Sequence, residues 1–134
     1  MNLNTTMDYR EIYARDRYRC IYCGRDMLKS LDDWLSLEID HIIPSSKSED
    51  NSLDNMVTSC NVCNKYKSSY FHEDLLKLSR EKQIEKIREH VLKKRLEQQL
   101  RWLKALRQYD DFKKTNILKD DSNLKRSPAT ELEI

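Results

Sequence analysis

The 134-residue chain is 38% hydrophobic and 36% charged, with 25 Lys and Arg against 23 Asp and Glu. Average usage predicts about nine glycines in this length, and the sequence has one, which excludes dinucleotide folds and phosphate-cradling loops that need several glycines at fixed spacing. The length and composition fit one small, helix-rich domain. Because the chain shows neither a long apolar run nor a signal-peptide pattern, we expect a cytoplasmic protein with no membrane partner.

The first half of the chain predicts short elements. Residues 8–19 mix apolar and charged side chains in a pattern typical of a short amphipathic helix. Residues 20–59 are rich in turn formers, and their apolar residues predict two short strands joined by a loop at residues 45–52. A short helix is expected over residues 60–70.

The second half predicts one long helix over residues 73–109, which contain almost no helix breaker. Between Lys77 and Arg107 there are 11 Lys or Arg against four Glu, a net charge of +7. Such a field attracts phosphate groups, although a solvated helix face explains the same charges.

The apolar stripe of this helix drifts along its length. It begins with Ile84, Ile87 and Val91 and then shifts to four leucines, Leu92, Leu96, Leu100 and Leu103. The drift favours core packing at the first end. Self-association at the other end, as a homodimer or larger assembly through residues 75–107, and a bend near residues 93–95 remain alternatives.

The predicted elements give an α+β fold with three parts. A small domain occupies residues 8–71, a basic helical extension occupies residues 72–109, and residues 110–134 form a loosely ordered tail.

The four cysteines form two identical C-x-x-C pairs, Cys20 with Cys23 and Cys60 with Cys63. Two such pairs supply the four thiolates of a tetrahedral zinc site. Disulfides are the alternative, but they need an oxidising compartment, and a redox motif needs only one pair. A four-thiolate site has no open coordination position, so we expect a structural zinc.

The single glycine, Gly24, directly follows the first cysteine pair. A zinc-binding turn often needs a positive φ at this position, which glycine adopts without steric cost. We therefore expect Gly24 to serve the metal-binding turn.

An Asp-His pair, Asp40 and His41, lies in the apolar segment between the cysteine pairs. Neighbours on a strand point to opposite faces, so the two serve one site from a strand end or a turn, or through the curvature of the backbone. The alternative is a turn aspartate and a partly buried histidine. Asn64 and the cations Lys65 and Lys67, directly after the last cysteine, make a functional site the preferred interpretation.

Taken together, these segments resemble the HNH endonuclease family. The residues that carry the resemblance are Tyr9–Gly24, Ile39–Pro44, Asp54–Val57 and Cys60–Lys67. The resemblance implies a ββα-metal core, in which two antiparallel strands, the loop between them and a helix build a site for one divalent cation. The loop departs from the family in having Ser46–Asp50 where a glycine pair is common.

The resemblance also implies a role for each matching residue. His41 is the general base that takes a proton from water, Asp40 and Asn64 hold the catalytic metal, and Asn55 orders the loop by hydrogen bonds and helps to orient the base. Lys65 and Lys67 stand where they can contact phosphates, Lys67 at a lysine position of the family pattern.

These residue types suit phosphodiester hydrolysis. Mg²⁺ often takes one or two protein ligands and keeps several waters, and Mn²⁺ can replace it. We therefore expect a DNA endonuclease that acts on double-stranded DNA and, as the resemblance implies, leaves 5′-phosphate and 3′-hydroxyl ends. The alternative is a non-catalytic, zinc-stabilised module that binds DNA or a protein.

Overall fold

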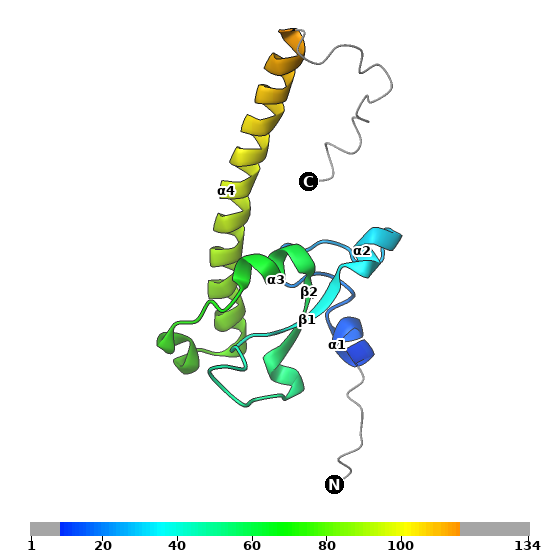
Figure 1. Cartoon of the computed structure of the whole chain (residues 1–134). Coiled ribbons are helices and arrows are strands. Elements are labelled where there is room, and N and C mark those ends of the chain that lie inside the picture. Colours follow the sequence, from blue (N-terminus) through cyan, green and yellow to red (C-terminus); the bar gives the residue numbers. More distant parts are fainter. Residues whose placement is uncertain (1–8, 116–134) are drawn as a thin grey trace. The chain divides into compact units, whose positions relative to one another are not determined.

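A computed structural model of the chain describes residues 9–115. The helices are α1 (Tyr9–Arg15), α2 (Leu31–Leu35), α3 (Asn61–Lys67) and α4 (Arg80–Lys114), the strands are β1 (Leu37–His41) and β2 (Met56–Cys60), and two 3-10 helices are η1 (Leu53–Asn55) and η2 (Glu73–Lys77) (Figure 1). The structure confirms the predicted α+β class.

The two strands pair antiparallel along their whole length, from Leu37 opposite Cys60 to His41 opposite Met56. The loop that joins them covers the predicted residues 45–52 and ends in η1. Helix α3 follows β2 directly and contacts both strands. The order β1, β2, α3 is therefore the ββα arrangement that the family resemblance implies.

The core joins the cysteines to the first part of α4. Cys20, Cys60 and Cys63 are buried in one cluster with apolar side chains from the loops, the strands and α4, and the α4 members are Ile84, Ile87 and Val91. A core of this size stabilises a fold only modestly. Because three of the cysteines belong to this core, a metal bound at the cysteines would stabilise the whole cluster.

Helix α1 is shorter than the sequence predicts. The pattern indicated a helix to residue 19, but α1 ends at Arg15, and Arg17 and Tyr18 have φ angles of +59° and +52°. Two consecutive residues in the left-handed region cannot continue a right-handed helix. The resulting turn leads the chain into the first cysteine pair.

The predicted long helix is interrupted near its start. The 3-10 helix η2 ends at Lys77, and α4 begins at Arg80 and continues to Lys114, beyond the predicted end at residue 109. Ser79 stands at the restart, where its hydroxyl oxygen accepts a hydrogen bond from the Lys82 N–H at 3.3 Å, as a helix N-cap does. Helix α2, begun in the same way by Ser30, was not predicted.

The chain divides into two compact units, Met1–Leu96 and Glu97–Ile134. In the first unit, α4 buries Ile84, Ile87 and Val91, which confirms the predicted core packing. Farther along α4, Leu100 and Leu103 are exposed, and self-association through residues 75–107 stays a prediction, as do the domain boundaries. Among residues 9–115, no helix has the length and apolar character needed to cross a membrane.

Candidate functional site

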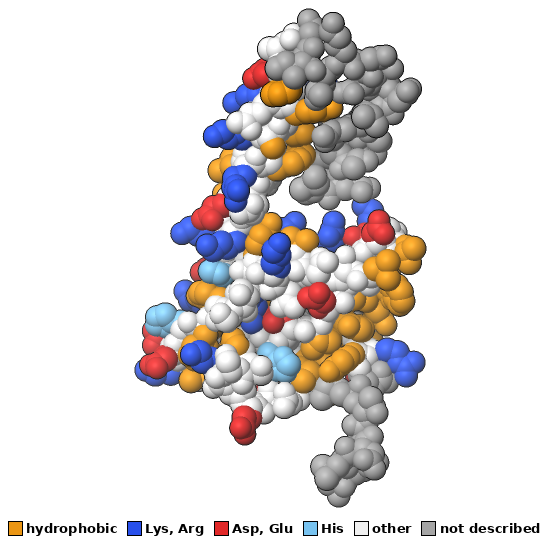
Figure 2. All heavy atoms as spheres, viewed as in Figure 1, with side chains coloured by type: hydrophobic (Ala, Val, Ile, Leu, Met, Phe, Trp, Pro, Cys, Tyr) orange, Lys and Arg blue, Asp and Glu red, His pale blue; other side chains and the backbone are white. Residues whose placement is uncertain are grey.

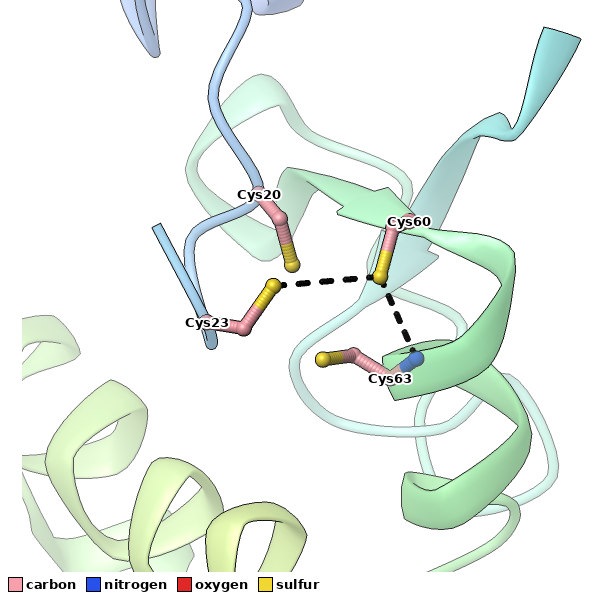
Figure 3. Close-up of side chains that lie close together, drawn as sticks. All are labelled: Cys20, Cys23, Cys60 and Cys63. Carbon is pink, nitrogen blue, oxygen red and sulfur yellow. Dashed lines mark hydrogen bonds between the residues drawn. The ribbon is translucent and has the colours of Figure 1, made fainter. Parts of the chain in front are cut away.

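The four cysteines converge on one point from two segments (Figure 3). Cys20 and Cys23 lie in the turn after α1, Cys60 ends β2, and Cys63 lies in the first turn of α3. Their sulfur atoms all lie within 4.8 Å of one another, and the sulfurs of Cys23 and Cys60 are 3.9 Å apart. Four thiolates at about 2.3 Å from a tetrahedral zinc are about 3.8 Å apart. The cluster therefore fits a structural metal such as zinc.

Hydrogen bonding links the thiols within the cluster. It lowers the pKa of Cys20 and raises the pKa of Cys23 and Cys63, so without a metal the thiols share the charge unequally. The Cys60 sulfur also accepts a hydrogen bond from the Cys63 N–H at 3.4 Å. The thiolate is the form that binds metal. All four are free cysteines.

Gly24 has the positive φ expected from the sequence, at +78°. Its N–H donates to the Cys20 carbonyl oxygen at 2.8 Å, which closes the first metal-binding turn. A Cβ atom at this position would meet nothing within 4 Å. Any side chain is therefore disfavoured by the backbone conformation and not by crowding.

We expect Gly24→Val to lower zinc affinity about 5- to 30-fold, because a left-handed conformation costs an L-residue about 1–2 kcal/mol. Transfer of zinc to a chromophoric chelator measures the change. Gly24→Asn is the matched control, since asparagine tolerates positive φ and should retain zinc better than valine. Equal zinc retention by the wild type and the valine variant would contradict the assignment.

Asp40 on β1 has a buried carboxylate with two partners. The Tyr22 hydroxyl donates to Oδ2, and the Lys67 ammonium lies 3.2 Å from each carboxylate oxygen. Burial raises the pKa of Asp40, while the charge of Lys67 and the hydrogen bond from Tyr22 offset part of the rise. Burial, and the charge of Asp40, raise the pKa of Tyr22, so its hydroxyl stays a donor.

His41 lies at the end of β1 and turns toward the loop. Its Nε2 is 3.2 Å from Asn51 Oδ1. Because neighbouring strand residues point to opposite faces, His41 is half-buried while Asp40 is buried. The two residues therefore occupy the last two positions of β1, with their side chains on different faces of the strand.

Asn55 is buried and ties the loop to the end of β1. Its Oδ1 accepts the Ile43 N–H at 2.9 Å, and its Nδ2 donates to the carbonyl oxygens of Ile43 and Asp50 at 3.1 and 2.8 Å. The side chain thus bridges Ile43 and Asp50, the residue directly before Asn51. A loop held in this way keeps a fixed position relative to His41.

Asn64 on α3 contacts Glu38 of β1, a residue that the sequence analysis did not single out. Its Nδ2 donates to Glu38 Oε1 at 2.7 Å. Glu38 and Asp40 are two residues apart on β1, so they share one face of the strand. The alternation of side chains along a strand could therefore have identified Glu38 from the sequence, because Glu38 is two residues before Asp40.

The comparison with known families agrees with this geometry. Residues 20–69, which hold both cysteine pairs and the Asp-His pair, match the family model of the HNH endonucleases. The chain contains an HNH domain. No curated protein and no solved structure gives a significant match. The HNH domain indicates a nuclease or a nucleic-acid-related function.

The two lysines after the last cysteine, Lys65 and Lys67, differ in their exposure to solvent. Lys65 is exposed, as a phosphate contact requires. Lys67 is 1% exposed and donates to the His41 carbonyl oxygen at 2.7 Å in addition to its contact with Asp40. The structure therefore gives Lys67 an internal ion pair in place of the exposed position that a phosphate contact needs.

Tyr22 and Asn51 are the other contact residues that the sequence did not reveal. Tyr22 lies between Cys20 and Cys23 of the cluster, where an aromatic residue has no distinguishing pattern, and Asn51 is one of several polar loop residues. Only the folded chain brings them to Asp40 and His41.

Proposed function

We propose that the HNH domain hydrolyses phosphodiester bonds of double-stranded DNA, with His41 as general base and one divalent cation, and leaves 5′-phosphate and 3′-hydroxyl ends. The observation that supports this most directly is the presence of His41, Asp40, Asn55 and Asn64 on a ββα arrangement within the matched residues. The ends of the products follow from the family resemblance.

The contact with Asn51 supports a base role for His41. When Asn51 Oδ1 accepts a hydrogen bond from Nε2, that nitrogen carries the proton of the neutral ring. Nδ1 then keeps its lone pair and is the atom that takes a proton from the attacking water. In this proposal, Asn55 helps by fixing the loop that carries Asn51.

Asp40 and Asn64 would hold the divalent cation, because both offer oxygen atoms of the kind that Mg²⁺ or Mn²⁺ prefers. Asn64 donates to Glu38 through Nδ2, which leaves the side-chain oxygen Oδ1 of Asn64 for a cation. The contacts of Asp40 with Tyr22 and Lys67 use part of the lone pairs that a carboxylate offers. When bound, the cation supplies stabilisation of negative charge on the phosphate.

Exposed cations of the chain would position the DNA. Lys65 lies beside Asn64 on α3, and Lys and Arg side chains recur along α4 (Figure 2). Contacts of this kind bind phosphates without reading sequence. In this proposal they hold the duplex, while the chemistry belongs to His41.

The test is cleavage of supercoiled plasmid by the full chain in Mg²⁺ or Mn²⁺. His41→Ala is expected to lower the rate about 10²- to 10⁴-fold, the usual contribution of a positioned general base. His72→Ala is the control, because His72 is an exposed histidine outside this site, and it should leave the rate unchanged. If the wild type and His41→Ala leave the plasmid equally intact with either metal, the non-catalytic binding module becomes the better description.

A further inference from the structure

Helix α4 contacts both halves of the cysteine centre. Arg88 donates through Nε and Nη2 to the Ile21 carbonyl oxygen at 3.2 and 2.7 Å, and Ile21 lies inside the first cysteine pair. Arg95 Nη1 lies 3.8 Å from Cys63 Sγ of the second pair. Because seven residues make about two helical turns, both arginines extend from one face of α4.

The same face of α4 carries the apolar contacts. Ile87 and Val91 are fully buried in the cluster that contains Cys20, Cys60 and Cys63. The two arginines therefore flank a packed apolar stripe that already lies against the cysteines. This arrangement fixes the distance between Arg95 and the sulfur atoms.

The charge of Arg95 complements that of the thiolates. Four thiolates around one Zn²⁺ carry about two net negative charges. Arg95 Nη1 lies 3.8 Å from Cys63 Sγ, so its positive charge faces this negative charge directly. A guanidinium is weakly hydrated and always charged, so it can stay partly buried beside sulfur.

We propose that Arg95 is a positioning residue of the metal centre, and that zinc retention and the packing of residues 80–96 of α4 depend on each other. Arg95 neutralises part of the thiolate charge and orients Cys63, while the metal fixes the sulfur that Arg95 contacts. This proposal goes beyond the nuclease activity and does not require it.

Zinc release from the full chain to a chromophoric chelator tests the proposal. Arg95→Gln is expected to weaken zinc binding about 10-fold, at the lower end of the usual range for residues that contact metal ligands. Arg95→Lys keeps the charge and should recover part of the loss. Lys94→Gln is the matched control, because it removes an equal charge from an exposed neighbouring position and should not change zinc binding.

Hydrogen exchange gives the second readout. Chelation of zinc from the wild type should reduce the protection of the amides around Ile87 and Val91, and at saturating zinc Arg95→Gln should reduce it more than Lys94→Gln. The proposal is overturned if Arg95→Gln binds zinc as the wild type does, if both Gln variants lose zinc equally, or if protection around Val91 does not respond to zinc.

Discussion

Removal of zinc is expected to abolish the cooperative unfolding of the HNH domain. The four sulfur ligands join the turn before Gly24 to the start of α3, and three of the four cysteines are buried in the core. The apparent binding free energy of structural zinc is about 10–16 kcal/mol, which is comparable with the whole stability of a small domain. The apo protein should therefore lose its near-UV circular dichroism and its thermal transition.

Two controls separate the metal centre from general effects of the chelator. Zinc added back in excess should restore the transition, whereas Mg²⁺ should not, because it prefers oxygen ligands to thiolates. Cys23→Ser removes the ligand that is least buried and should weaken the metal site without opening a buried cavity. A transition of unchanged midpoint in the apo protein would show that the metal does not stabilise the fold.

Lys67→Met is expected to destabilise the protein by about 3–5 kcal/mol, the usual cost of leaving one charge of a buried pair without its partner. The Lys67 side chain is 1% exposed and that of Asp40 is 9% exposed, so water replaces little of the lost interaction. The His41 carbonyl oxygen loses its hydrogen bond as well. Urea unfolding at saturating zinc measures the difference in free energy.

The neighbouring lysine offers a matched control for this change. Lys65 is exposed on the same helix, and Lys65→Met should stay within about 0.5 kcal/mol of the wild type. In the double variant Asp40→Asn with Lys67→Met, the unpaired charge is gone and Tyr22 can keep an acceptor, so part of the lost stability should return. Equal destabilisation by the two single lysine variants would show that the ion pair contributes nothing.

The features of the fold that the sequence predicts are those that depend on residues close together in the chain. The C-x-x-C pairs indicate a four-sulfur cluster because one tight turn brings two thiols together, and the structure shows that cluster. The two strands and the short helix after Cys60 follow from apolar runs and turn formers, and the structure confirms them. Gly24 was recognisable because glycine is otherwise missing from the chain.

The parts that the sequence could not provide depend on contacts between distant residues. Lys67 resembles a surface cation in the sequence, and only its pairing with Asp40, 27 residues away, explains its burial. The start of α4 at Arg80, directly after Ser79, also escaped prediction, since one serine interrupts an otherwise helical pattern. The roles of Asp40, His41, Asn55 and Asn64 in catalysis stay predictions until cleavage is measured.

The cysteine cluster affects how β1 and β2 align, because Cys60 belongs both to the cluster and to β2. A two-stranded ribbon is marginally stable alone, and a slip of one residue would exchange its two faces. Cys60, opposite Leu37, is fixed at one end of the ribbon by the cluster, and His41, opposite Met56, lies at the other. A metal at the cysteines would therefore act as an alignment clamp, because it fixes the register that keeps Asp40 inside and His41 beside the loop.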